Sequence, residues 1–541
     1  MGIYVNPGNK AFSRINNSKY VDKTMLIDLI NQTIDGDACL TCVSRPRRFG
    51  KSYAARMLTA YYDCSCKSDA LFNDKEIAKT EHYKDHMNKY NVIRLDISTF
   101  TSVASREGIP LEEVPNMIVS ALKEDLLEMM PDFPSNASLL RLMMRCITMP
   151  DGKPFVFIID EWDAIIREGK KNEKAQKRFL ALIREWFKNE TFTPYAVAAA
   201  YLTGILPIKK GDDQTATSDF KEYSILHPGP MAPFFGFNEE EVKHVCDKYS
   251  MDFDTVQQWY DGYTVGPLNS VYNPYSVMWA AGETYDRYRS YWRNTTARET
   301  LRDFIDIDLD GLQEAVARLM AGESIEVNTE LFENDLSSFK SKDDVLTLLI
   351  HLGYLSYERH QLYEGGPSTV VARIPNMEAR LEFESILRNA RHKTLVEFVR
   401  KSDQLLKDVL AGREDAVAKV IHDVHDSNYA PTFYNHEQAL RSVIRLACIS
   451  WSDQYGKVEE LPSGHGLADI AFIPKRDNAN KLPGIIFELK WDQCEEGAIY
   501  QIKKNNYPKV LEQFESEVEL VGVNYDSEDK VHTCKIEHMR K

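Results

Sequence analysis

Gly50, Lys51 and Ser52 form a candidate phosphate-binding site. They follow the apolar segment CLTCVS and precede a helical pattern, so they lie where a predicted strand meets a predicted helix. At such a junction, backbone N–H groups and the positive end of the helix face an anion. We expect Lys51 to reach the β and γ phosphates of ATP, and the Ser52 hydroxyl to ligate magnesium. An ordinary loop before a helix would also carry these three residues.

The surrounding loop is basic. No acidic residue occurs between Asp37 and Asp63, whereas the segment RPRRFGK carries three arginines and one lysine. Such a region attracts polyphosphate, and we expect Arg45 and Arg48 to contribute to nucleotide binding. Arg45 stands where the usual phosphate-binding pattern has its first glycine. For Arg48, a solvated basic face is the alternative interpretation.

Two acidic residues end a later apolar segment, PFVFIIDEWD, which reads as a buried strand. Phosphoryl transfer to water needs one carboxylate for the metal ion and another for the attacking water. We assign Asp160 to the magnesium shell and Glu161 to the orientation or deprotonation of water. Two acids that cap a turn are the alternative. Thr203, which ends the next predicted strand, could sense the γ phosphate, although core packing explains its position nearly as well.

A second group of residues, near the C-terminus, suits phosphodiester cleavage. Asp469 lies in LADIAFIP, and Glu488 and Lys490 lie two apart in GIIFELKW, so the latter pair shares one side of a predicted strand. We expect Asp469 and Glu488 to bind Mg²⁺, with Mn²⁺ also suitable, and Lys490 to orient or deprotonate water or stabilise charge. An exposed strand face is the alternative, but the apolar residues before Glu488 favour a buried acid that needs a partner.

The elements that position these residues indicate an α/β fold. Between residues 36 and 205, apolar runs alternate with helical patterns, which indicates a parallel sheet covered on both faces. We expect strands at 39–44, 91–98, 154–160 and 195–204, and helices at 52–62, 111–130, 135–148 and 171–189. Residues 237–420 are mostly helical, and 345–376 predict a helix followed by a two-stranded hairpin, which resembles a winged helix. The C-terminal segments LADIAFIP, GIIFELKW and VELVGVNYD predict strands of a second α/β unit.

Motifs along nearly the whole chain carry a family resemblance. They are YVDKT at 20–24, RPRRFGKS at 45–52, DEWD at 160–163, LTGI at 202–205, FGF at 235–237, WYDGY at 259–263 and VYNPYS at 271–276. In this order they resemble the bacterial AAA-ATPase-like proteins that carry a C-terminal PD-(D/E)XK nuclease domain. That family shows the same RPRRFGK[ST] form, so the resemblance implies that arginine at position 45 is normal for this group.

The resemblance and the pattern of elements together predict three regions. They are a P-loop NTPase domain over 1–265, a helical and winged-helix-like middle region over 266–424, and a PD-(D/E)XK, restriction-endonuclease-like α/β domain over 425–541. AAA-type relatives often assemble as rings, so the resemblance is compatible with a homo-oligomer, although no arginine finger can be identified in the sequence.

The resemblance also adds residues to the second site. It implies Glu437, in NHEQAL, as the acid on the preceding helix, and Gln501, in QIKKNNY, as the residue that follows the catalytic strand. Tyr507 completes that motif only if the helix ends before it, because residues six apart do not share a helix face. Leu467 stands two residues before Asp469, where these nucleases often have arginine.

The amino-acid composition restricts the kinds of partner that the protein can bind. Lys and Arg total 66 against 82 Asp and Glu, which gives a net charge of -16 and a pI near 5.4. This balance argues against a general nucleic-acid coat, so a polyanion must be held by a local basic surface or through metal ions. No apolar run approaches the roughly 20 residues that cross a bilayer, and the N-terminal residues lack the apolar core of a secretory signal. We expect a cytoplasmic protein with no membrane partner.

These patterns favour an ATP-binding and ATP-hydrolysing protein coupled to a divalent-metal-dependent nuclease. Its expected partner is nucleic acid, with DNA favoured over RNA. The competing hypothesis is a nucleotide-gated assembly or interaction protein whose C-terminal site is weak or idle.

Overall fold

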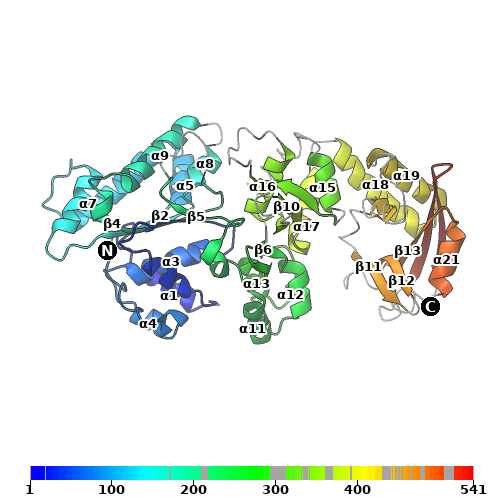
Figure 1. Cartoon of the computed structure of the whole chain (residues 1–541), viewed down its shortest axis with the longest axis horizontal. Helices are drawn as coiled ribbons and strands as arrows, with labels where there is room; N and C mark the ends of the chain where they lie inside the picture. Colours follow the sequence, from blue (N-terminus) through cyan, green and yellow to red (C-terminus); the bar gives the residue numbers. More distant parts are fainter. Residues whose placement is uncertain are drawn as a thin grey trace. The chain divides into compact units, whose positions relative to one another are not determined.

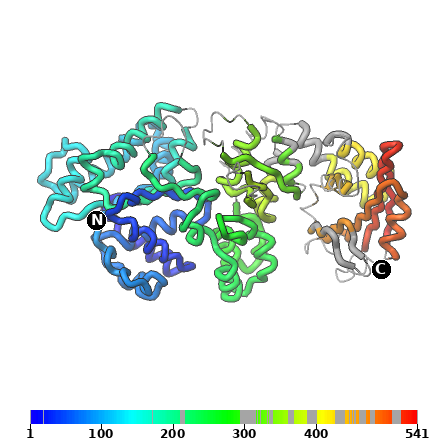
Figure 2. The backbone as a smooth tube through the Cα atoms, in the orientation of Figure 1, coloured from blue at the N-terminus to red at the C-terminus, as the bar shows by residue number. Residues whose placement is uncertain are grey.

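The computed structural model describes most of the chain in two compact units. Outside the description lie residues 1, 19, 170–171, 209–216, 293–311, 321, 331, 333–338, 340, 360–368, 390–392, 429–439, 442, 445–446, 449–450, 452–454, 464–465, 475–481, 505–516 and 540–541. Unit 1 comprises Met1–Trp292 and Glu326–Ala379, and unit 2 comprises Arg293–Ile325 and Arg380–Lys541. Figure 2 traces both units in sequence colours. No helix in the described ranges has both the length and the apolar character needed to cross a membrane.

Unit 1 contains a parallel five-stranded sheet in the order β2-β3-β4-β1-β5. Its strands are β1 (Leu40–Ser44), β2 (Asn91–Asp96), β3 (Phe155–Asp160), β4 (Val197–Gly204) and β5 (Lys221–Tyr223). Every residue of β1, β3 and β4 is buried. Strands covered on both faces are apolar along their whole length, which explains why the sequence showed continuous apolar runs there.

Helices cover both faces of this sheet (Figure 1). One face carries α1 (Lys10–Asn16), α2 (Met25–Asn31), α3 (Lys51–Tyr62) and α4 (Asp69–Phe72), and the other carries α5 (Ile97–Glu107), α6 (Val114–Met129), α7 (Leu139–Thr148), α8 (Ala164–Glu168) and α9 (Glu173–Phe187). The short helix α10 (Thr193–Ala196) leads into β4, and 3-10 helices occupy η1 (Glu76–Lys79), η2 (Leu111–Glu113) and η4 (Gly229–Phe234). Phe157 of β3 packs in one core with Ile118 and Leu122 of α6 and Phe179 of α9.

The predicted strands and helices of this region are confirmed, with shifted boundaries. The strand expected from 195 begins at Val197, because Thr193–Ala196 form α10, and the helix expected from 135 begins at Leu139. The strand expected over 91–98 ends at Asp96, because the Asp96 side chain accepts hydrogen bonds from the Ser98 backbone N–H at 3.1 Å and the Ser98 hydroxyl at 2.6 Å. This N-cap begins α5, a helix that the apolar pattern did not predict.

The remainder of unit 1 is a smaller helical and sheet region. It contains α11 (Glu239–Tyr249), α12 (Phe253–Tyr260), β6 (Tyr263–Val265), β7 (Leu268–Val271), α13 (Pro274–Ala280), α16 (Lys342–Leu352), β9 (Ser356–Arg359) and β10 (Thr369–Arg373). The expected helix and hairpin over 345–376 correspond to α16, β9 and β10, and β8 (Ile325–Asn328) adds a third strand in the order β8-β10-β9. The expected domain boundary at 265 falls inside the antiparallel pair β6–β7. The three-region division stays a prediction.

Unit 2 has a five-stranded sheet in the order β11-β12-β13-β14-β15. Its elements are α15 (Leu312–Met320), α18 (Lys393–Leu410), α19 (Glu414–Asn428), β11 (Tyr455–Ser463), β12 (Gly466–Pro474), β13 (Gly484–Trp491), α21 (Glu495–Lys504), β14 (Val518–Asp526) and β15 (Val531–Met539), while α17 (Met377–Asn389) crosses the unit boundary at Ala379. Only β13 and β14 pair in parallel, and α21 lies in the connection between them. The three predicted C-terminal strands are present, and assignment of this unit to the PD-(D/E)XK fold stays a prediction.

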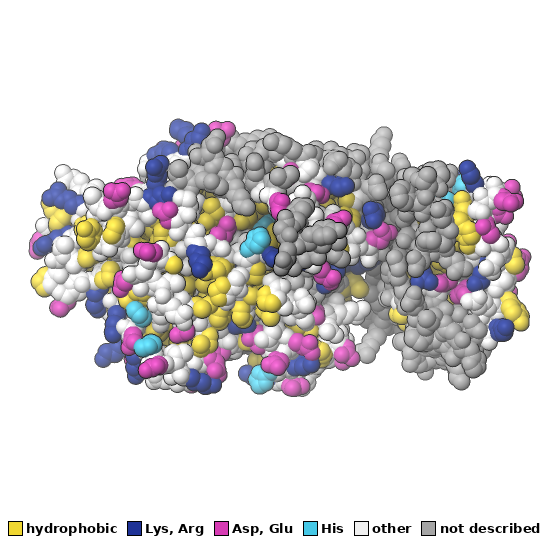
Figure 3. All heavy atoms as spheres, in the orientation of Figure 1, with side chains coloured by type: hydrophobic (Ala, Val, Ile, Leu, Met, Phe, Trp, Pro, Cys, Tyr) yellow, Lys and Arg dark blue, Asp and Glu magenta, His cyan; other side chains and the backbone are white. Residues whose placement is uncertain are grey.

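Charged side chains of both signs are interspersed over the face of unit 1 that Figure 3 displays. That face therefore provides no single basic field for a nucleic acid, which agrees with the acidic net charge.

The Asp96 cap yields a stability prediction. Asp96→Ala should weaken the first turn of α5 by about 1 kcal/mol, since the Ser98 amide loses its acceptor, whereas Asp96→Asn should retain most of the cap. Hydrogen exchange measured over residues 97–101 tests this: exchange should be faster in the alanine variant alone. Equal exchange in all three proteins would contradict the cap assignment.

Candidate functional sites

The loop between β1 and α3 has the backbone shape of an anion-binding turn. Gly50 precedes the first residue of α3 with φ of 93°, and Arg48 has φ of 70°. A Cβ added at Gly50 would meet no atom within 4 Å, so glycine is favoured there by the left-handed conformation and not by lack of space. The N-terminal amides of α3 begin directly after this turn, where an anion is stabilised.

Lys51 is buried beneath the loop. Its Nζ donates hydrogen bonds to the backbone carbonyls of Arg45, at 3.0 Å, and Pro46, at 2.9 Å. Burial lowers the pKa of Lys51, and the nearby carboxylates of Glu161 and Asp160 oppose that shift. Lys51 therefore faces the acidic pair that the sequence placed on another strand. Its contact with a phosphate stays a prediction, as does metal ligation by the half-buried Ser52.

Arg45 points into the protein interior. It is fully buried, and its Nη1 donates to the carbonyls of Ser44 at 2.9 Å and Tyr223 at 2.8 Å. Its guanidinium lies 5.3 Å from the centre of the Phe235 ring. Burial lowers the pKa of Arg45 to about 10. In this arrangement Arg45 supports the loop from within, and its predicted contribution to nucleotide binding would be indirect unless the guanidinium leaves these carbonyls.

Residues from the smaller region of unit 1 hold the outer side of the loop. Arg48 lies 4.2 Å from the centre of the Tyr275 ring and donates a hydrogen bond to the Tyr291 carbonyl. Phe49 packs edge-on against Tyr263, with ring centres 5.1 Å apart. The loop thus packs against Tyr275 of α13 and Tyr263 of β6, which belong to the sequence motifs VYNPYS and WYDGY. A phosphate contact by Arg48 stays a prediction.

Asp160 is fully buried at the end of β3. One oxygen, Oδ2, accepts a hydrogen bond from Arg94 Nη2 at 3.1 Å. The other, Oδ1, accepts from the Thr203 hydroxyl at 3.3 Å and from the Glu161 backbone N–H at 3.1 Å. The strand order explains the first two contacts, because β2 and β4 flank β3 and the register pairs Asp160 with Thr203. Thr203 therefore lies beside the acidic pair, where a sensing role was expected.

Glu161 adopts a left-handed backbone conformation, with φ of 49°. A non-glycine residue in this region is uncommon, and such strain concentrates at functional sites. Its Oε2 accepts a hydrogen bond from Arg167 Nη2. Burial raises the pKa of Glu161, while Lys51 and Arg167 oppose the shift.

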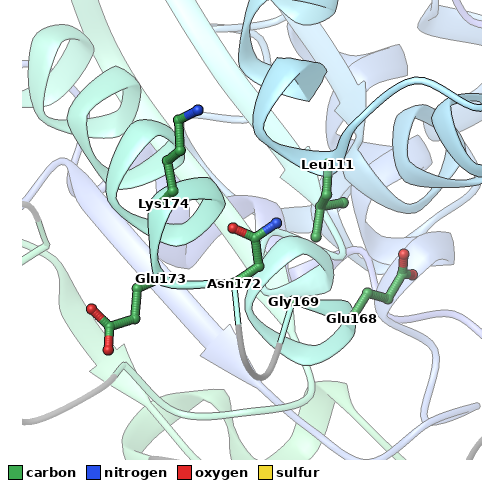
Figure 4. Close-up of a pocket in the computed structure, with 6 residues that line it drawn as sticks. All are labelled: Leu111, Glu168, Gly169, Asn172, Glu173 and Lys174. Atoms are coloured by element: carbon green, nitrogen blue, oxygen red, sulfur yellow. The ribbon is translucent and has the colours of Figure 1, made fainter.

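A shallow depression lies elsewhere in unit 1, between η2 and the start of α9. Its lining residues are Leu111, Glu168, Gly169, Asn172, Glu173 and Lys174. The charged side chains of Glu168, Glu173 and Lys174 point away from one another (Figure 4). Because its polar groups do not converge, this depression is not a candidate catalytic site.

The second site forms on two antiparallel strands of unit 2. The antiparallel register pairs Ile470 of β12 with Phe487 of β13. Asp469, which precedes Ile470, therefore lies across from Glu488, which follows Phe487. Asp469 Oδ2 accepts a hydrogen bond from the Leu489 N–H at 2.9 Å. Asp469 and Glu488 are therefore brought together, as the sequence predicted.

Glu488 is the most buried member of this group, with 2% of its surface exposed. Its Oε1 accepts a hydrogen bond from Gln501 Nε2 and lies 3.5 Å from Lys490 Nζ. Its Oε2 is buried without a hydrogen-bond partner in the described part of the chain. Burial, followed by repulsion from Asp469, raises the pKa of Glu488 to about 8, and Lys490 opposes the shift. A bound cation would offset both the cost of burying the Glu488 carboxylate and its repulsion from Asp469.

Several residues at the two sites were not identified from the sequence. Arg441 Nη2 lies 2.5 Å from Asp469 Oδ1, Arg94 pairs with Asp160, and Arg167 pairs with both Glu161 and Asp163. Of these ion pairs, only Asp163–Arg167 could have been predicted from the sequence, because opposite charges spaced i,i+4 often pair on a helix. Glu437 and Tyr507 lie outside the described residues. Among the residues that the structure does describe, no three His, Cys, Asp or Glu side chains are grouped to hold a metal ion.

The raised pKa of Glu488 predicts a pH-dependent stability. Its carboxyl binds a proton in the folded chain up to about pH 8 but in the unfolded chain only up to its ordinary value of 4.5. The folded state therefore carries more protons in this window, and its stability without metal should fall as pH rises from 4.5 to about 8. Denaturant unfolding in EDTA should show a steeper fall for the natural sequence than for Glu488→Gln. Parallel pH profiles would contradict the prediction.

Comparison with known proteins supports an ATP-binding function for the N-terminal region. Residues 8–212 match the model of a family described as "Predicted AAA-ATPase". The match includes Lys51, Asp160 and Glu161 but ends before β5, so it does not cover unit 2. No curated protein sequence matches the chain significantly. Among solved structures, the Aeropyrum pernix ORC1 protein in complex with DNA is 12% identical, with 68% of this chain and 91% of that chain covered, and its TM-score of 0.24 is too low to carry an inference.

Proposed function

We propose that unit 1 hydrolyses ATP at the carboxyl ends of β1, β3 and β4. The observation that carries this proposal is the burial of Lys51 at the start of α3, facing the Asp160–Glu161 pair. A lysine, a helix N-terminus and two carboxylates are the groups that triphosphate hydrolysis requires. The family match over residues 8–212 supports the same function.

Each residue has a distinct task in this proposal. Lys51 exchanges its two loop carbonyls for phosphate oxygens, while the N-terminal amides of α3 donate to the same phosphates. The Asp160 carboxylate and the Ser52 hydroxyl are hard oxygen ligands that suit Mg²⁺, which neutralises phosphate charge when bound. Glu161 takes a proton from the attacking water, and Thr203 senses the γ phosphate by exchanging its hydrogen bond to Asp160 for one to that phosphate.

We further propose that unit 2 cleaves phosphodiester bonds at Asp469, Glu488 and Lys490. The unpartnered buried oxygen of Glu488, opposite a second carboxylate, supports a divalent cation at this position. Bound Mg²⁺ or Mn²⁺ would supply Lewis acidity to the scissile phosphate. Lys490 is suited to orient water or stabilise the developing charge, and Gln501 holds Glu488. The sequence resemblance favours DNA over RNA as the substrate.

The alternative function, a nucleotide-gated assembly with an idle nuclease site, is favoured by the Arg441–Asp469 ion pair, because that contact competes with a metal ion. Size measurements with and without ATP and magnesium, made beside a cleavage assay, distinguish the two functions. ATP-dependent assembly without cleavage of DNA or RNA supports the alternative.

Glu161→Gln should retain ATP binding and reduce ATP turnover by roughly 10²- to 10⁴-fold, because the variant keeps the size of the side chain and loses the general base. Equilibrium binding and phosphate release measure the two quantities. Glu185→Gln, at an exposed position of α9, is the matched control and should behave as the natural sequence. Normal turnover by Glu161→Gln would exclude Glu161 as the base.

Lys490→Ala should abolish Mg²⁺-dependent cleavage of DNA while leaving the circular dichroism spectrum and ATP turnover unchanged, because it removes only the charge beside Glu488. Lys504→Ala, an exposed lysine on α21, is the control. A nuclease assay with and without EDTA tests the prediction. Undiminished cleavage by Lys490→Ala would reject the proposed role.

A further inference from the structure

We propose that Arg167 is a positioning residue for ATP hydrolysis, which orients the Glu161 side chain from a fixed anchor at Asp163. This inference rests on the proposed ATPase function of unit 1. Arg167 lies on α8, the short helix that follows the acidic pair, and its side chain is largely buried, with 13% exposed.

The anchor is Asp163, which is itself buried and tied to the chain beyond β4. Asp163 Oδ2 accepts hydrogen bonds from the backbone N–H groups of Ile205, at 3.1 Å, and Leu206, at 2.9 Å. The same oxygen accepts from Arg167 Nε at 3.0 Å. Two backbone donors fix the carboxylate, so it offers a stable partner to the arginine.

Gly204 permits this close approach between the chain after β4 and the acidic segment. A Cβ at Gly204 would lie 2.8 Å from Asp163 Oδ1 and 2.8 Å from the Trp162 ring. The backbone N–H of Trp162 also donates to the Thr203 carbonyl at 3.0 Å. The LTGI and DEWD motifs are therefore joined in one close contact.

Arg167 links the Glu161 side chain to the anchored Asp163 carboxylate. Its guanidinium is planar, and it meets Asp163 through Nε and Glu161 through Nη2, so one side chain bridges both carboxylates. Of the two carboxylate oxygens of Glu161, only Oε2 bonds to Arg167. Within the described residues, no hydrogen bond is made to Glu161 Oε1, so that oxygen is left to receive the proton of an attacking water.

We expect the bridge from Arg167 to affect the rate of ATP hydrolysis more than the affinity for ATP. Within the described residues, Arg167 forms hydrogen bonds and ion pairs to Asp163 and Glu161 but none to Lys51, Ser52 or Asp160, so removing it should change ATP binding little. A general base that is no longer held in place can cost about 10²-fold in rate. The charges of Lys51 and Arg47 also act on Glu161, but in the described part of the chain neither side chain hydrogen-bonds to it, so neither replaces the bridge from Arg167.

The test compares Arg167→Ala, Arg167→Lys and Arg178→Ala, with turnover measured as single-turnover hydrolysis of γ-labelled ATP and binding measured with a fluorescent ATP analogue. Arg178 pairs with Glu113 at the surface and serves as the control arginine. We expect Arg167→Ala to lower kcat by about 10- to 100-fold with Kd for ATP within about twofold. Arg167→Lys, which keeps the charge but cannot bridge, should fall between Arg167→Ala and the natural sequence.

A second background separates positioning from a merely structural role. In Glu161→Gln chains, where the base is absent, adding Arg167→Ala should change the residual rate by no more than about twofold. An equal loss in both backgrounds, or weaker ATP binding with unchanged kcat, would overturn the inference. If Arg167→Ala does not fold, the same comparison is made with Arg167→Lys. Full turnover by Arg167→Ala beside an inactive Glu161→Gln rejects the inference alone, whereas a natural chain that binds ATP without turnover rejects the proposed function as well.

Discussion

Burial of carboxylates is the constraint on which both sites depend. Removing an ionised carboxyl group from water costs several kcal/mol unless opposite charge or hydrogen-bond donors replace the solvent. Asp160 meets this requirement with Arg94 and Thr203. Asp163 meets it at Oδ2, through two backbone amides and Arg167, whereas its Oδ1 has no hydrogen-bond partner in the described residues. Glu488 meets it only in part, because one of its oxygens has no hydrogen-bond partner in the described residues. The proposed cation would offset this remaining cost at Glu488.

The parallel sheet of unit 1 provides the geometry. Because β4 lies between β1 and β3, the loop between β1 and α3, Thr203 and the Asp160–Glu161 pair all occur at the carboxyl ends of neighbouring strands. The smaller region of unit 1 then holds the loop through Arg48 and Phe49. Residues of α13 and β6 therefore pack against the loop whose carbonyls accept hydrogen bonds from Lys51.

Much of this arrangement could be predicted from the sequence. The apolar runs that became β1, β3 and β4 are continuous because those strands are buried on both faces. The GKS segment lies in the connection from β1 to α3, and DEWD begins at Asp160, the last residue of β3. The start of α5 was missed because the Asp96 cap interrupts an apolar run that otherwise continues as a strand. Arg94 and Arg441 were missed for another reason: their partners are 66 and 28 residues away, so the ion pairs exist only once the strand register or the packing of unit 2 is fixed.

Anomalous scattering from Mn²⁺, in crystals of the whole chain grown with a non-hydrolysable ATP analogue, tests both proposed sites at once. We expect one manganese peak within bonding distance of Asp160 beside the triphosphate, with Lys51 turned from the Arg45 and Pro46 carbonyls to the phosphates. We expect a second peak between Asp469 and Glu488, with Arg441 displaced from Asp469. A bound triphosphate with no manganese at Asp160, and with Lys51 still on the loop carbonyls, would exclude the proposed ATP site.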